Sequence, residues 1–260
     1  MKIRAIILSA LILCGISAVI MYSRAAQPQQ KSSVITQAIN DKNTPMVIKN
    51  LILKMKEQME VNDDQFPELI KEVENYTNSC ADSASVAVLH SMLAEMYQNY
   101  YQRNQWTINQ RTQLSGYIPE DIRVWTSNLF TDKIKEEIDL SLRPTALLQN
   151  TPVSKFKDIL EIGKDSQTLR PTLYEFLAFR ALDIQPTVQI YKDLIAFQNK
   201  EPNMKSVLLT ELDYLRFLYG DKRDKESFEA YMNALDELYR NLASQNYATE
   251  ILIAKLDLVS

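Results

Sequence analysis

The stretch from Asp82 to Trp106 constrains the fold most, because it is long, rich in apolar residues and free of proline and glycine. Its apolar side chains recur at steps of three and four, the spacing of one face of an α-helix, at Val86, Leu89, Leu93, Tyr97 and Tyr100. A second apolar row runs beside the first, at Val88, Met92 and Met96. An apolar sector this wide is typical of a helix packed on two sides, so we expect it at the centre of an all-α domain.

The composition also favours helices. The chain of 260 residues has only four glycines, whereas sheet proteins usually need more glycine for their turns. With 46% hydrophobic and 24% charged residues it is long enough to bury a core without disulfides or metals. Its net charge is −4 and no dense basic patch occurs, so we expect no nucleic-acid partner.

Residues 34–165 are predicted to form an N-terminal helical bundle. Thr44-Pro45 has the pattern of an N-cap followed by a first-turn proline, which predicts the start of a first helix. A second amphipathic helix is predicted from Phe66 to Asn78. Asp82 can cap the central helix. Further along, Pro119 leads a pattern that stops before Pro144, and Thr151-Pro152 predicts another N-cap before a short helix that ends near Leu160.

Residues 166–260 are predicted to form a helical-repeat segment that continues the bundle. Pro171, Pro186, Pro202 and Gly220 divide it evenly, with one amphipathic segment in each interval. Thr172 with Glu175 has the pattern of a capping box. Two helices make a unit of 34 residues, the period of tetratricopeptide-like hairpins, although the tetratricopeptide consensus is absent. The predicted fold is therefore all-α, a tetratricopeptide-like α-solenoid array of antiparallel helical hairpins.

The N-terminus predicts export. Lys2 and Arg4 precede an apolar run, and small residues near Ala25 suit cleavage, so residues 1–26 are interpreted as a signal peptide. An uncleaved membrane anchor and a lipid-modified Cys14 are the alternatives. Residues 27–33 are predicted to be a flexible leader. We expect an extracytoplasmic protein, in the periplasm or cell envelope, that touches the membrane only through this N-terminal segment. After cleavage Cys80 is the sole thiol, interpreted as a partly buried turn residue.

Catalytic chemistry has little support. His90 is the only histidine, and we interpret it as a structural residue with a hydrogen-bond partner. No phosphate loop, metal motif or acidic calcium loop occurs, and Glu136-Glu137 is interpreted as solvated helix surface. We expect no catalytic residues, no cofactor and no metal. The enzyme alternative is a carboxylate-only hydrolase that would use Glu95 and His90.

Aromatic residues offer the one candidate interaction surface. Tyr97, Tyr100, Tyr101 and Trp106 are concentrated on one predicted helix, and exposed tyrosine and tryptophan are good binding anchors. Helical spacing favours core packing for them, and the same holds for the aromatic residues of the repeat segment.

Short stretches along the chain carry a resemblance: Ala87–Ser91, Tyr97–Tyr101, Gly163-Lys164, Leu169–Ala178, Arg180–Asp183, Ile190–Phe197 and Ala234–Leu238. They resemble the N-terminal helical region that precedes the macroglobulin domains of large bacterial alpha-2-macroglobulin family proteins, and Arg170-Pro171-Thr172-Leu173-Tyr174 is the most specific. That family is associated with trapping proteases, in many members through a Cys-Gly-Glu-Gln thioester. This sequence has neither the thioester motif nor macroglobulin domains. The resemblance therefore implies an accessory helical module outside the cytoplasm.

We predict a non-enzymatic extracytoplasmic helical scaffold or interaction module with an unidentified protein partner. The alternative is a free-standing periplasmic tetratricopeptide-like adaptor that binds peptides or partner proteins. Tyr247 to Ser260 begins another apolar helical pattern and ends without a polar tail, so we expect a truncated or split version of a longer protein.

Overall fold

The computed structural model describes residues 43–61, 65–112, 118–160, 163, 165–200, 203–220, 224–242 and 248–259. Over these ranges the chain is helical and holds no β-strand, apart from one isolated bridge between Pro152 and Thr172. The all-α prediction is confirmed. The predicted signal peptide and the predicted leader lie outside the described residues. The described chain divides into two compact units, unit 1 (residues 43–144 and 153–163) and unit 2 (residues 145–152 and 165–259).

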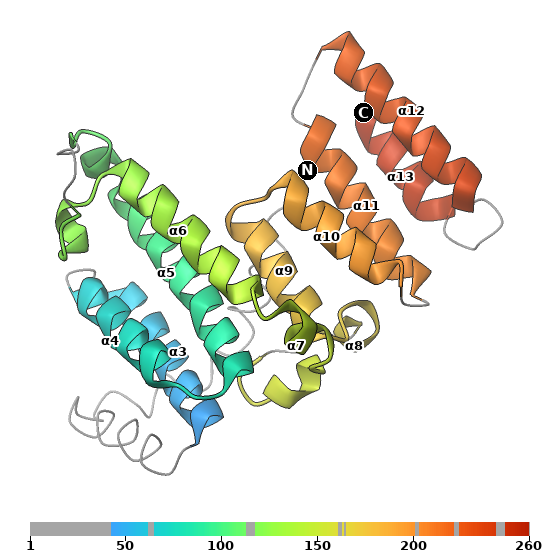
Figure 1. Ribbon diagram of the computed structural model, residues 1–260. Coiled ribbons are helices and arrows are strands. Elements are labelled where there is room, and N and C mark those ends of the chain that lie inside the picture. The colour runs from blue at the N-terminus through green and yellow to red at the C-terminus, as the bar shows by residue number, and fades with distance from the viewer. Residues whose placement is uncertain are drawn as a thin grey trace. The chain divides into compact units, whose positions relative to one another are not determined.

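Unit 1 is built around one long helix. Its helices are α3 (Thr44–Val61), α4 (Phe66–Ser79), α5 (Ser83–Ile108) and α6 (Ser127–Leu142), with short 3₁₀ turns η3 (Ile122–Val124) and η4 (Val153–Phe156). Helix α5 packs against α4 on one side and α6 on the other (Figure 1). The organising stretch of the sequence is therefore the central helix of its unit.

Local signals explain where α5 begins and why it is buried. The Asp82 carboxylate accepts a hydrogen bond from the Ser85 backbone N–H at 3.2 Å, so the predicted cap is confirmed. Both apolar rows of the helix are buried apart from Val86, which is half-buried, and this is the two-sided packing that the pattern indicated. Cys80 is half-buried at the junction that precedes the helix.

Two predicted helix starts in unit 1 are wrong. Asn43, one residue before Thr44, caps α3, because its Oδ1 accepts from the Met46 backbone N–H at 3.2 Å. The pattern led by Pro119 is not one helix. A 3₁₀ turn comes first, the backbone is extended at Trp125 and Thr126, and only then does α6 begin.

Unit 2 contains α7 (Thr145–Gln149), α8 (Ser166–Leu169), α9 (Leu173–Ile184), α10 (Val188–Gln198), α11 (Met204–Tyr219), α12 (Lys225–Leu242) and α13 (Ala248–Val259). From α9 to α13 each helix packs against the next one along the chain, and α7 packs against α9 (Figure 1). The last three helices enclose one apolar cluster: Leu208, Leu212, Tyr231, Leu235, Ile251 and Ala254.

Two helix starts were predicted from cap patterns in unit 2, and the structure confirms one of them. Thr172 and Glu175 form the predicted capping box at the start of α9. The Thr151-Pro152 pattern does not start an α-helix; a 3₁₀ turn follows instead. The reason is a non-local contact, since Thr151 O accepts from the Leu173 backbone N–H at 2.8 Å and Pro152 bridges to Thr172.

Candidate interaction surfaces

The four aromatic candidates on α5 have different environments. Tyr97 and Tyr100 are buried, and Tyr101 is half-buried. Their rings form one cluster with Trp125 and Phe130, with centroid distances such as 5.7 Å from Tyr97 to Trp125 and 5.9 Å from Tyr101 to Phe130. The cluster belongs to the core, so Tyr97 and Tyr100 cannot act as surface anchors without unfolding.

Trp106 is the exception among the four. Its side chain is 79% exposed at the C-terminal end of α5, although large aromatic residues are normally buried in part. The other three candidates pack toward Phe130, whereas Trp106 lies about half a helical turn away from Tyr97 around the axis. Among the four candidates, Trp106 is therefore the one that stays on the surface, on the side of α5 opposite to Tyr97.

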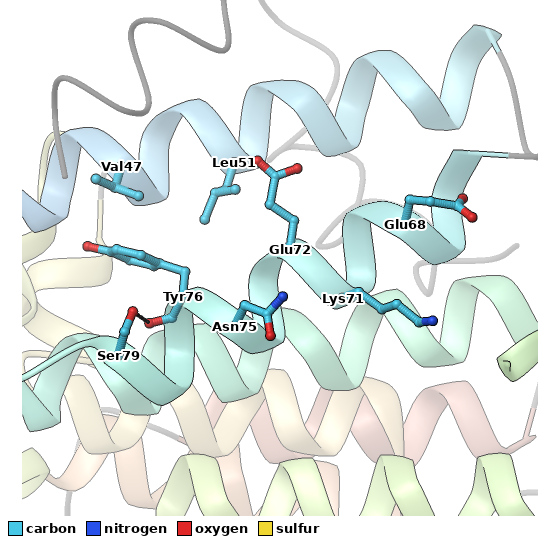
Figure 2. A pocket seen from close by; sticks show the side chains of 8 residues that line it. All are labelled: Val47, Leu51, Glu68, Lys71, Glu72, Asn75, Tyr76 and Ser79. Atoms are coloured by element: carbon cyan, nitrogen blue, oxygen red, sulfur yellow. Dashed lines mark hydrogen bonds between the residues drawn. The ribbon is translucent and has the colours of Figure 1, made fainter. Parts of the chain in front are cut away.

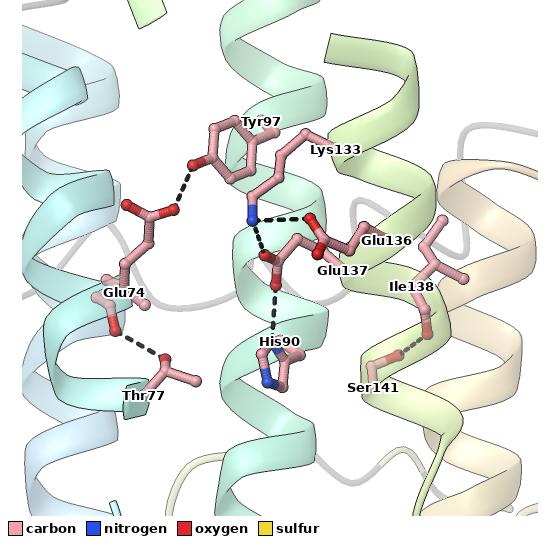
Figure 3. Close-up of polar contacts among 10 residues, drawn as sticks. Glu74, Thr77, His90, Tyr97, Lys133, Glu136, Glu137, Ile138 and Ser141 are labelled. Atoms are coloured by element: carbon pink, nitrogen blue, oxygen red, sulfur yellow. Dashed lines mark hydrogen bonds and ion pairs between the residues drawn. The ribbon is translucent and has the colours of Figure 1, made fainter. Parts of the chain in front are cut away.

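A buried polar network joins α5 to α6 (Figure 3). His90 Nδ1 lies 2.7 Å from Glu137 Oε2, and the other Glu137 oxygen accepts from Lys133 Nζ at 2.8 Å. Lys133 also reaches Glu136 at 3.0 Å. The expected hydrogen-bond partner of His90 is thus a carboxylate on a neighbouring helix.

The interpretation of Glu137 as solvated surface is wrong, because its side chain is almost fully buried. Burial opposes ionisation, but the hydrogen bonds from His90 and Lys133 outweigh it and lower the pKa of Glu137. Burial also opposes the charge of Lys133, and its bonds to the two glutamates raise its pKa overall. The charges of Glu137 and Lys133 thus stabilise each other.

A second buried contact links α4 to α5. The Tyr97 hydroxyl donates to Glu74 Oε1 at 2.6 Å (Figure 3). Burial and this hydrogen bond raise the pKa of Tyr97, so the phenol stays protonated. Because the carboxylates of both networks are held by their neighbours, their arrangement suits helix positioning and supplies no poised general base.

A groove lies between α3 and α4, with a volume of about 500 Å³ (Figure 2). Val47 and Leu51 project into it from α3, and Tyr76 faces them from α4. Glu72 on its rim forms an ion pair with Lys54 across the two helices. The groove is open and mostly apolar, and its polar groups do not converge on one point, so it indicates no particular chemistry.

Unit 2 carries a charged and aromatic cluster on α9, α10 and α11. The Arg170 guanidinium lies 3.7 Å from the centre of the Phe179 ring, and burial lowers its pKa despite nearby carboxylates. Asp213 forms an ion pair with Arg216 at 2.9 Å. The Asp213–Arg216 pair lies within α11, whereas Asp183 of α9 and Asp213 of α11 both attract Arg170, so it is Arg170 that links the two helices.

Aromatic rings on α10 and α11 extend this cluster. Tyr191 packs against Tyr214 at 5.2 Å and against Phe217 at 5.4 Å between centroids. Burial raises the pKa of Tyr191 to about 12. Phe217 is partly exposed, but Tyr191 is buried, so most of this aromatic surface is internal.

Helix α13 is apolar on two sides. Ile251 and Ala254 are buried in the cluster with α11 and α12. On the opposite side Leu252, Ile253 and Leu256 are 46%, 53% and 65% exposed. Contiguous large apolar side chains on a surface helix are typical of a binding site, so this outer face of α13 is the strongest candidate surface in the described chain.

Other classes of site find no support in the described part of the chain. No three His, Cys, Asp or Glu side chains come together there in a way that could hold a metal ion. None of the helices within the described ranges is both long enough and apolar enough to cross a bilayer. Comparison with protein-family models, with curated proteins and with solved structures finds no match for this chain.

Proposed function

We propose that this protein is a non-enzymatic helical interaction module that acts outside the cytoplasm. The observation that carries the proposal is the outer face of α13, where three large apolar side chains stay exposed although the opposite side of the helix completes the core. A helix with two apolar sides gains free energy when a second partner covers the exposed side. We propose that a protein partner covers the exposed apolar side of α13.

The proposed architecture is a helical array of the tetratricopeptide-like kind. Its support is the order of packing in unit 2, where each helix from α9 to α13 contacts the next one along the chain. Arrays of this kind bury a continuous core between neighbours and present extended binding surfaces along their helices. The outer face of α13, with three exposed apolar side chains, is a candidate for such a surface.

The proposed setting follows from the sequence. The N-terminal segment favours export, and the resemblance centred on Arg170-Pro171-Thr172 favours an accessory module of an alpha-2-macroglobulin-like protein. Reading the DNA that follows the codon for Ser260 tests this link. Coding sequence for β-rich domains supports it, and an unrelated gene there contradicts it. The peptide-adaptor alternative has less support, since two of its aromatic candidates, Tyr97 and Tyr100, are buried.

Site-specific photo-crosslinking tests the interaction proposal. A photo-reactive phenylalanine analogue replaces Leu256 in the cells that produce the protein, and a second strain carries it at Lys205, an exposed residue of α11. We expect a discrete adduct from position 256 alone. Substituting Leu252 by Gln in the same strain should remove the adduct, because it takes away an adjoining part of the apolar face.

Two results would contradict the proposal. One is the absence of any adduct at position 256, and the other is the same set of adducts at both positions. Cell fractionation of the same strains tests the location separately, because an exported protein leaves the cytoplasmic fraction.

A further inference from the structure

We propose that the outer face of α13 binds a basic amphipathic helix of a partner protein, an inference that rests on the proposed role as an interaction module. Three properties of the α12–α13 hairpin lead to it. They are the helical spacing of the exposed apolar residues, the charge of the hairpin and the position of that charge along the edges of the face.

The apolar residues form a ridge suited to a helix. Leu252, Ile253 and Leu256 follow one another at helical spacing, and the exposed Thr249 continues the row toward the N-terminus. The ridge spans about 10 Å along the axis, roughly two turns of a helix. Recognition of an amphipathic helix uses apolar anchors at this same spacing on the partner.

The hairpin is strongly acidic. Residues 224–242 and 248–259 contain seven carboxylates against three basic side chains, Lys225, Arg240 and Lys255, a net charge of −4. Without the predicted signal peptide, which contains Lys2, Arg4 and Arg24 and no acidic residue, the chain has a net charge of −7, so this hairpin carries more than half of the excess negative charge. A partner with basic flanks would match it.

The charged residues of α13 lie along the edges of the apolar ridge. Glu250 and Asp257 are seven residues apart, so both flank the ridge along the same edge of α13. Lys255, the one basic residue of α13, is on the other edge and already forms an ion pair with Asp236 of α12, with its ammonium 5.4 Å from the Tyr239 ring centre. One edge of the ridge thus carries Glu250, whose Oε2 is buried, and the exposed Asp257, and on the other edge Asp236 neutralises Lys255. Asp257 is therefore the carboxylate best placed to attract cations from a partner.

A second copy of this chain fits the face less well. Two α13 helices placed together would bring two hairpins of charge −4 into contact, and like charges repel. A stable dimer also buries about 800 Å² on each partner, far more than three side chains provide. A basic helix avoids the repulsion, and its opposite charge supplies attraction beyond the small apolar contact.

Fluorescence anisotropy with a designed probe tests the inference on the full chain. The probe is a labelled peptide of leucine and lysine patterned as an amphipathic helix, and its counterpart replaces each lysine by glutamate. We expect the basic peptide to bind and the acidic one not to bind. Replacing Leu252 and Leu256 together by Gln should weaken binding at least about tenfold, since each buried leucine contributes strongly.

Matched variants separate this face from general attraction to an acidic protein. Val188→Gln removes an exposed apolar side chain on α10 and should leave the affinity within about twofold. Glu250→Gln combined with Asp257→Asn should weaken binding by roughly threefold to tenfold and flatten its salt dependence. Thermal unfolding confirms that each variant is folded.

Several outcomes would overturn the inference. The acidic peptide could bind as tightly as the basic one, or the Leu252/Leu256 double variant could bind as well as the wild type. Self-association that sedimentation detects in the wild type and not in the double variant would identify a second copy as the occupant. An acidic partner cross-linked at position 256 would leave the interaction module standing and refute the basic helix alone.

Discussion

Replacing Glu137 by alanine gives the sharpest test of how unit 1 is held together. The carboxylate is 2% exposed and joins His90 to Lys133 across two helices, at 2.7 and 2.8 Å. Its removal leaves the half-buried His90 imidazole without this partner and leaves the half-buried Lys133 ammonium with Glu136 alone. Breaking a buried pair in this way costs about 3–5 kcal/mol, so we expect a loss of that size in the free energy of unfolding at pH 7.

The control variant is Asp139→Ala on the same helix. Asp139 pairs with Lys135 at 2.7 Å, but both side chains are more than half exposed. Such surface pairs contribute about 0–1 kcal/mol. Urea unfolding followed by tryptophan emission suits the comparison, because the only tryptophans, Trp106 and Trp125, both lie in unit 1.

The pH dependence adds a second test. The pKa of Glu137 is lower in the folded state than in the unfolded chain, where it is about 4.3. Its stabilisation is therefore fully present above that pH and is lost as the pH falls through the folded-state pKa. Wild type and Glu137→Ala should converge in stability in acid. A loss no larger than that of Asp139→Ala, or a gap that persists in acid, would refute the reasoning.

Three further predictions concern packing, capping and exposure. Leu93→Ala, in the core of α5, should cost about 2–5 kcal/mol in urea unfolding, whereas Leu53→Ala on the exposed side of α3 should change stability by less than about 0.5 kcal/mol. Thr172→Ala removes half of a capping box and should lower stability by about 0.5–2 kcal/mol, measured by circular dichroism, and an unchanged value would contradict the box. Acrylamide should quench Trp106 emission strongly, and Trp106→Phe should leave the blue-shifted, protected emission of Trp125; equal quenching before and after would contradict the exposure.

Local patterns in the sequence predicted most of the helices. The stretch from Asp82 to Trp106 became α5 with ends within two residues, because its apolar spacing and its cap act within one or two turns. The Thr172–Glu175 box was predictable for the same reason, since both partners lie in the first turn of α9. Interactions between residues that are close in sequence can be recognised in a single sequence.

Contacts between distant residues explain what was missed. Trp125 was expected inside a helix, but its ring N–H donates to Pro119 O at 2.6 Å and its own carbonyl accepts from Arg111 at 2.8 Å, so the chain turns there. Glu137 is buried because His90, 47 residues earlier in the chain, provides its partner. Neither side chain differs in its local pattern from one that faces solvent.

The outer face of α13 also shows what a sequence pattern cannot predict. The pattern from Tyr247 to Ser260 predicted an apolar helix, and α13 is that helix, but periodicity cannot say which of its two apolar sides is covered. The structure places Ile251 and Ala254 inside and leaves Leu252 and Leu256 outside. Substitutions at the inner pair should therefore reduce stability, and those at the outer pair should reduce binding while leaving the fold intact. That separation makes the proposed role of α13 testable without knowledge of the partner.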